Sequence, residues 1–383
     1  MSNTITNLIP DIIKAWEIAS REKPNLINAV SKNASASKAA KNETVRSPVA
    51  PENSTYDVTP SMTPLAAADM AYTNRDITLD TEKGYKFHFE SEEQMGLRGS
   101  GAYDTMFQQN VANSYKKICA DVSTAVAALY YNASRAYGTA GTTPFATDLS
   151  PLNAAKTILD RNGAPDDRYC ILDYNAAFNF TNLTQNTNVN QAGSDVTRRT
   201  GEMLPTHGFR VMQDGNVPTH TVGTSVNQDV NGGDAIGTTS ITYHGGDGGT
   251  ILVGDTVSIS GDTSGPGGTV SRYVVNTAIT AAAGEIVINS PGLISAWGDT
   301  TEIALGSTDY VANLAFSSDA FQLGARAPQG DDSAIDETII VDPMTGLPFR
   351  FAVYKGYRVT NYEVSLLFGV GKGNPAHAAI IMG

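Results

Sequence analysis

The chain has 383 residues, of which 41% are hydrophobic and 17% charged, and its formal net charge is −13. This length predicts about two to three domains with a buried core, and the composition excludes a disordered chain. The negative charge repels phosphate backbones, which argues against sequence-specific DNA binding.

The first 64 residues predict a short helix followed by a polar segment that has no core of its own. A short amphipathic helix is indicated by apolar residues at helical spacing, namely Leu8, Ile12, Ile13 and Trp16. Residues 31–64 are rich in Ser, Asn, Ala and Pro, so we expect them to lie extended or against another surface. The first 50 residues carry seven Lys/Arg and four Asp/Glu, which fits either an arm across an acidic neighbour or a solvated tail.

The N-terminus and the two cysteines indicate where the protein is located and the redox state of its thiols. The N-terminus lacks a positively charged leader, and no apolar run approaches the ~20 residues that span a bilayer. Cys119 and Cys170 lie inside apolar stretches, as buried thiols do. We therefore expect a soluble, intracellular protein with both cysteines reduced.

The next segment predicts a β-hairpin followed by a long helix. Alternating apolar residues on both sides of Lys83-Gly84 place the hairpin turn there, and they are Ile77, Leu79, Tyr85, Phe87 and Phe89. Apolar residues then recur at steps of three and four from Tyr103 to Tyr137, and Gly138 can end the helix. About 35 residues at 1.5 Å each would make a rod of roughly 50 Å.

A mixed α/β segment and a β-rich segment complete the chain. Between 150 and 212 the pattern predicts two helices, one from Ser150-Pro151 to Gly163 and one capped by Asp173 and reaching Leu183. It also predicts two strands, over Tyr169–Leu172 and Phe209–Met212. Residues 236–312 predict an inserted β-module. Long alternating runs from 338 to 382 favour an α+β fold whose sheet packs on the long helix.

One glycine-rich stretch, SGDTSGPGGTVSRYVV at 260–275, invites a phosphate-binding interpretation. Phosphate loops lead from a strand directly into a helix, whose N-terminal amide groups face the anion. Here both flanks read as strands, and Thr269 stands where the Walker lysine would be. We therefore expect a hairpin loop.

Residues with catalytic chemistry are sparse. The histidines show no metal-ligand spacing, and we expect them to be surface or packing residues: His88, His207, His220, His244 and His377. Neither cysteine has a nearby histidine, and there is no G-x-S-x-G motif. The acidic run at 90–93 reads as a solvated turn. The sequence predicts no catalytic, cofactor-binding or metal site, and no enzyme.

An arm, a finger and a rod that cannot each be stable alone indicate a protein completed by its neighbours. Several stretches along the whole chain resemble the major capsid (coat) proteins of tailed bacteriophages, in the branch of short-tailed phages whose coat protein carries a β insertion. They are LIPDIIKAWEIASRE, VRSPVAPE, EEQMGLRGSGAY, SRAYGTAGTTPF, LDRNGAP, THGFRVMQDGNVPTHTVGT, GDTVSISG, YVANLAFSSDAFQLGARAP, VDPMTGLPFRFAVYKGYR and FGVGKGNPAHAAIIMG.

The resemblance implies the capsid fold shared by tailed phages and herpesviruses. The expected division of the chain is an N-arm over 1–55, an extended loop over 56–95, a peripheral domain with the spine helix over 96–140, an axial domain over 141–235, a β insertion over 236–312, an axial return over 313–334 and a peripheral sheet over 335–383.

The resemblance also implies a structural function. Copies would form the pentamers and hexamers of an icosahedral virion capsid, assembled in the host cytoplasm with a scaffolding protein and a portal. The shell would enclose double-stranded DNA without reading its sequence, and without a cofactor or a membrane. Some members of the wider fold crosslink a loop lysine to an asparagine; Lys83 and Lys86 lie on the expected loop, but no acidic catalyst is evident and no crosslink is predicted.

Two alternatives stay open from the sequence. The first is a cellular nanocompartment shell of the same fold, which would enclose a protein cargo. The second, from a different class, is a soluble β-rich module that binds sugars or peptides with its insertion and stays monomeric.

Overall fold

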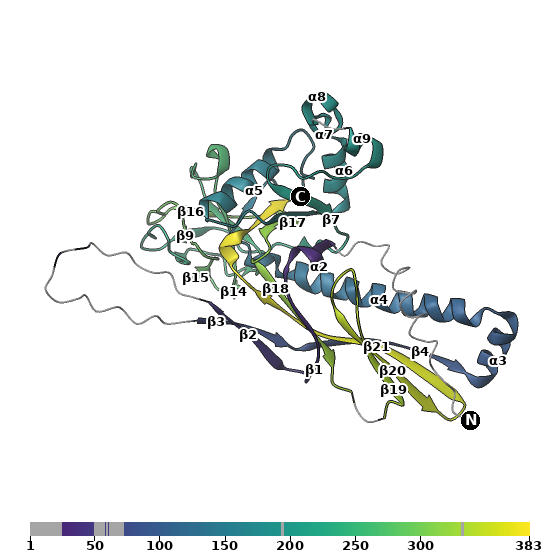
Figure 1. Ribbon diagram of the computed structural model, residues 1–383. Coiled ribbons are helices and arrows are strands. Elements are labelled where there is room, and N and C mark those ends of the chain that lie inside the picture. Colours follow the sequence, from purple (N-terminus) through teal and green to yellow (C-terminus); the bar gives the residue numbers. More distant parts are fainter. Residues whose placement is uncertain (1–24, 50–57, 59, 61–72, 193–194, 331–332) are drawn as a thin grey trace.

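The computed structural model describes residues 25–49, 58, 60, 73–192, 195–330 and 333–383. The helix expected around residues 8–16 lies outside these ranges. The fold is α+β, as the sequence predicts: two large sheets and two small ladders combine with one long helix and several short ones (Figure 1). No helix in the described ranges is long and apolar enough to cross a bilayer.

The longest helix, α4 (Tyr103–Ala127), has the expected apolar stripe but ends before the predicted Tyr137. A 3-10 segment, η1 (Ala128–Asn132), continues it, and Ala133 then turns to extended backbone with φ −67° and ψ 144°. The strand β5 (Arg135–Tyr137) is paired on both sides in the larger sheet, so its backbone groups are not available to extend the helix. The rod, called the spine helix below, is therefore 25 residues long, about 38 Å at 1.5 Å per residue.

The spine helix packs on a six-stranded sheet. Its strand order is β1-β18-β21-β20-β19, and β4, the sixth strand, lies off this path and also pairs with β21. Strands β19 to β21 form an antiparallel meander, and β1 is parallel to β18. The bounds are β1 (Ser31–Ala39), β4 (Thr81–Glu90), β18 (Phe321–Pro328), β19 (Asp336–Val341), β20 (Pro348–Gly356) and β21 (Val359–Lys372).

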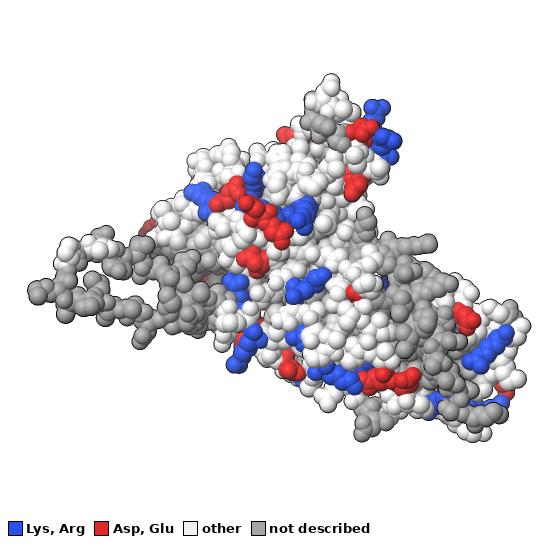
Figure 2. Space-filling model, viewed as in Figure 1, with Lys and Arg blue, Asp and Glu red and all other residues white. Residues whose placement is uncertain are grey.

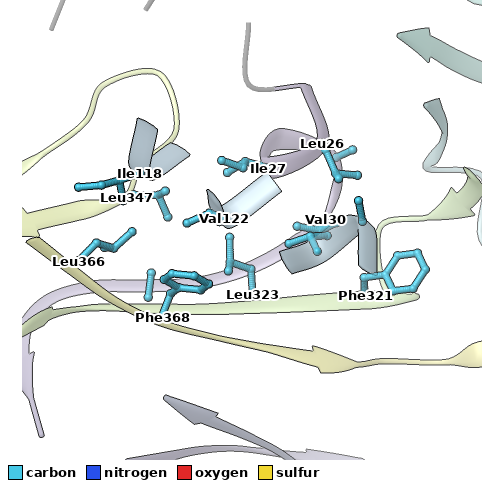
Figure 3. Close-up of a cluster of buried hydrophobic side chains, with 14 of the residues drawn as sticks. Leu26, Ile27, Val30, Ile118, Val122, Phe321, Leu323, Leu347, Leu366 and Phe368 are labelled. Atoms are coloured by element: carbon cyan, nitrogen blue, oxygen red, sulfur yellow. The ribbon is translucent and has the colours of Figure 1, made fainter. Parts of the chain in front are cut away.

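The main hydrophobic core lies between the spine helix and this sheet (Figure 3). Val122, in the middle of the helix stripe, is 0% exposed and lies near Leu323 of β18. The short helix α2 (Asn25–Ala29) adds Leu26 and Ile27 from the other side. Residues from both ends of the chain thus contribute to one core.

The β-hairpin expected around Lys83-Gly84 is wrong in its pairing. The strand β3 (Thr73–Leu79) pairs antiparallel with β2 (Glu43–Val49), in a segment expected to be extended. After the single residue Asp80, β4 pairs with β21 instead, and Gly84 lies inside that strand. The period of two identified both strands, but it carries no information about their partners.

The base of the β2–β3 hairpin lies directly on a surface of three glycines, called the glycine saddle: Gly324, Gly369 and Gly371. A Cβ atom at Gly369 would lie 2.0 Å from the carbonyl oxygen of Thr78, which only glycine avoids. Ile77 and Leu79 also contact the saddle and are almost fully buried. The saddle therefore fixes where the hairpin leaves the body.

The larger sheet has twelve strands, in the order β15-β10-β9-β16-β12-β13-β5-β22-β17-β6-β7, with β8 paired to β17. The strands of its second half are β6 (Arg168–Leu172), β7 (Phe209–Gln213), β8 (Thr219–His220), β17 (Tyr310–Ser317) and β22 (Ala378–Met382). The expected peripheral segment 335–383 is thus divided between sheets, because β22 pairs with β17 and β5. Its five residues are all buried, which calls for partners on both sides.

Five helices of the described chain form the upper lobe of Figure 1, in which α5 and α6 pack on this half of the sheet and α7 to α9 lie beyond α6. They are α5 (Ser150–Arg161), α6 (Tyr174–Asn182), α7 (Thr184–Thr187), α8 (Val189–Ala192) and α9 (Val196–Thr200). The predicted starts of the two longer helices are confirmed. Pro151 occupies the first turn of α5, and the Asp173 carboxylate accepts the Asn175 N–H at 3.1 Å.

The first half of the larger sheet closes into a barrel. A bridge between Val275 and Ile288 joins the two end strands, so six antiparallel strands enclose a separate core around Tyr243, Tyr273 and Trp297. They are β9 (Gln228–Val230), β10 (Ser240–His244), β12 (Thr256–Ile259), β13 (Arg272–Val274), β15 (Gly284–Val287) and β16 (Glu302–Leu305). A small ladder of β11 (Thr250–Ile251) and β14 (Ile279–Thr280) lies beside them.

The barrel begins earlier in the chain than the insertion expected at 236–312. Strand β9 precedes that range and pairs with both β10 and β16. Strand β17, which starts inside the range, belongs to the other half of the sheet. The division into domains as such stays a prediction.

We expect an excised fragment of residues 222–307 to fold, with dispersed amide resonances and β-type circular dichroism. The fragment 236–312 should be poorly folded, because it lacks β9 and with it Val230, which is 0% exposed in the barrel core. A fragment of this size should be stable by only a few kcal/mol, so the loss of one strand matters. Equal dispersion in the NMR spectra of both fragments would show that β9 is dispensable.

Candidate functional site

Within the described ranges, no group of three His, Cys, Asp or Glu side chains could hold a metal ion. The five histidines are dispersed. His88 and His207 lie at the surface, His244 and His377 are half-buried, and His220 is buried in a polar cluster described below. No two of them are brought together as ligands of one site.

The glycine-rich loop at 260–271 joins β12 to β13, which pair antiparallel, so the predicted hairpin loop is confirmed. Its amide groups bond within the loop: Gly265 N–H donates to the Thr269 carbonyl, and Gly268 N–H donates to the Gly265 carbonyl. Arg161, at the end of α5, donates to the Ser264 carbonyl at 3.0 Å. The loop therefore faces a helix C-terminus, the end that disfavours an anion.

A Tyr-His-Asp arrangement, with the histidine and aspartate buried and the tyrosine half-buried, lies where the spine helix meets the barrel. The Tyr130 hydroxyl lies 2.7 Å from His220 Nδ1, and His220 Nε2 lies 2.7 Å from Asp255 Oδ1. The order of the groups resembles a catalytic triad, with Tyr130 in the place of the nucleophile, His220 of the base and Asp255 of the acid. However, burial and then the Asp255 charge raise the pKa of Tyr130 to about 12. The hydroxyl stays protonated at neutral pH, so this tyrosine is not an activated nucleophile.

The two thiols are equally inert. Cys119 is half-buried and Cys170 is buried, and both are free. Burial, and then the Asp342 charge, raises the pKa of Cys119 to about 12, and burial alone raises the pKa of Cys170. The thiolate is the reactive form, so neither cysteine is a nucleophile at neutral pH.

Candidate contact surfaces are more prominent than candidate reaction sites. The β2–β3 hairpin projects from the body, to the left in Figure 1. Large apolar side chains are exposed on α6, at Tyr174 (61%) and Phe178 (67%), and at the far end of the smaller sheet, at Tyr357 (94%). Figure 2 shows basic and acidic side chains interspersed on the visible face.

No protein-family model matches the chain, and neither does any curated protein sequence. Among solved structures it is similar to the mature capsid of bacteriophage PhiM1, at 11% identity and a TM-score of 0.43, covering 92% of this chain and 85% of that chain. It is similar to the capsid of a native GTA particle, at 10% identity and a TM-score of 0.46, covering 94% and 90%. It is also similar to a virus-like particle from Pyrococcus furiosus, at 7% identity and a TM-score of 0.42, covering 98% and 99%.

Proposed function

We propose that this chain is a major capsid protein that assembles with copies of itself into an icosahedral shell enclosing the double-stranded DNA of a tailed phage. The observation that carries the proposal is the β2–β3 hairpin, which projects from the body on the glycine saddle. A two-stranded hairpin is marginal in water, so it needs a surface to lie on. A neighbouring copy supplies that surface in a closed shell.

The parts of the chain take definite roles in this proposal. The N-arm includes β1, and the extended loop, expected over 56–95, includes β3 and draws in its partner β2. The spine helix and the smaller sheet form the peripheral domain. The axial domain is formed by the helices α5 to α9 and by the second half of the larger sheet, whose strands lie in the order β5-β22-β17-β6-β7. The barrel is the insertion.

The proposed partners follow from the same role. Scaffolding and portal proteins would guide assembly in the host cytoplasm, and packaged DNA would lie inside the virion capsid. The net charge of −13 supports a wall that does not retain DNA during packaging.

Co-expression with its proposed scaffolding protein is expected to give megadalton particles, seen by size-exclusion chromatography and negative-stain microscopy. Each contact is weak alone and gains strength from closure of the shell. A strictly monomeric protein under every assembly condition would overturn the proposal and favour a binding module. Particles that form without a scaffold around a protein cargo would favour the nanocompartment shell.

A further inference from the structure

Three side chains from separate parts of the fold meet in one polar cluster, called the polar joint: the half-buried Tyr130 and the buried His220 and Asp255. Tyr130 belongs to η1 at the end of the spine helix, and His220 to β8 in the axial half of the larger sheet. Asp255 belongs to the barrel, in the turn before β12. His220 is 4% exposed and Asp255 is 2% exposed, so water reaches neither freely.

The donors to Asp255 come from both sides of the boundary between barrel and body. The Leu252 N–H, from the barrel itself, donates to Asp255 Oδ2 at 2.6 Å. Gly223 N–H lies 3.1 Å from Oδ1 and 3.2 Å from Oδ2, and it belongs to the segment that leads from β8 into the barrel. His220 Nε2 completes the set. Since a carboxylate only accepts, Nε2 donates to Asp255, and in the neutral imidazole Nδ1 then accepts from the Tyr130 hydroxyl.

Packing around the joint leaves little space for another arrangement. Gly254 has φ +99°, and a Cβ atom there would lie 2.9 Å from the Tyr130 ring and 3.0 Å from His220 Nδ1. The Tyr310 hydroxyl donates to the Gly254 carbonyl at 2.6 Å. Asn289 of the barrel also donates to the Tyr131 and Ala133 carbonyls, directly after the spine helix.

We propose that the polar joint fixes the orientation of the barrel on the end of the spine helix. The backbone of residues 128–135 and 219–223 is then held in place by the carboxylate of Asp255, which belongs to the barrel. Apolar contacts tolerate sliding, whereas hydrogen bonds are directional and a buried donor without an acceptor is strongly disfavoured. The joint is complete only when barrel and body are docked in this one geometry. The inference concerns the unassembled chain and does not depend on the proposed capsid function.

Two substitutions at one position separate hydrogen bonding from simple packing. Asp255→Ala leaves His220 Nε2–H and the amides of Gly223 and Leu252 without an acceptor. Asp255→Asn keeps the shape: its carbonyl oxygen can accept from the two amides, while its NH2 donates to the other imidazole tautomer. That tautomer then donates from Nδ1 to the Tyr130 oxygen. Asp255→Asn should therefore restore most of the hydrogen bonds that Asp255→Ala removes.

Hydrogen exchange of the full-length, unassembled chain, followed by mass spectrometry, tests the joint. In Asp255→Ala we expect residues 128–135 and 219–223 to exchange on the order of 100-fold faster, since several donors lose their partner. In Asp255→Asn the exchange should return to within about tenfold of the wild type.

The matched control is Asp262→Ala in the same barrel. Asp262 is also buried and accepts from Ser264 N–H at 2.9 Å and from Ser271 N–H at 3.4 Å, but these donors belong to the barrel. Its replacement should speed exchange inside the barrel and leave 128–135 unchanged. Equal acceleration of 128–135 by Asp262→Ala and Asp255→Ala, or no acceleration by Asp255→Ala, would overturn the proposal.

Discussion

Val122→Asp is expected to cost at least ~3 kcal/mol of folding free energy, because it places an unpaired charge in the closed core between the spine helix and the smaller sheet. Val122 is 0% exposed, and Figure 3 shows around it Ile27 of α2, Leu323 of β18 and Leu366 of β21. Whole domains are stable by only about 5–15 kcal/mol. The variant should therefore be largely insoluble, or it should melt far below the wild type in a thermal scan followed by circular dichroism.

Asn113→Asp is the matched control for this effect. Asn113 lies in the same helix but on its exposed face, where a new carboxylate stays in water. Its effect should lie within about 0.5 kcal/mol of zero. Soluble, native-like Val122→Asp protein would mean that the helix stripe does not face the core.

Gly369→Ala is expected to displace the base of the β2–β3 hairpin from the glycine saddle. The new methyl group would meet the backbone of Thr78 at 2.0 Å, and a backbone atom cannot rotate away as a side chain can. Overpacking of this kind costs about 1–3 kcal/mol. Limited proteolysis and hydrogen exchange should show lost protection at Ile77 and Leu79, and particle yield should fall if the chain forms a shell.

Gly84→Ala tests whether a methyl group added elsewhere on this sheet would also displace the hairpin. Gly84 lies inside β4, and a Cβ atom there would lie 3.4 Å from the Cβ of Ser365, which is close to ordinary contact. Its hairpin protection should match the wild type. Equal loss of protection in both variants would mean that the saddle has no special role.

Sequence patterns predicted the elements better than their partners. The stripe of the spine helix follows from local periodicity, and so do the starts of α5 and α6. The end of the spine helix was missed because the pairing of β5 with β13 and β22 is a tertiary contact that competes with helical bonding. Strand β9 was missed because a three-residue strand, QDV, has no period to detect.

The polar joint could not have been found from spacing. Asp255 lies 35 residues from His220, and Tyr130 lies 90 residues before it. No short motif links them, and their burial depends on the barrel being docked. The glycine saddle was missed for the same reason. Gly324 and Gly369 come from separate strands and meet only when β18 pairs with β21.

The single residue between β3 and β4 has a mechanical consequence. A pull on the projecting hairpin passes through Asp80 directly into β4, whose register with β21 runs from Thr81 opposite Phe368 to Glu90 opposite Val359. Because ladder hydrogen bonds lie perpendicular to the strands, a force along β4 loads all of these pairs in shear instead of opening them one after another. Tension applied to the β2–β3 hairpin would therefore be shared across the whole of β4, and the hairpin would act as a tether anchored along the length of the sheet.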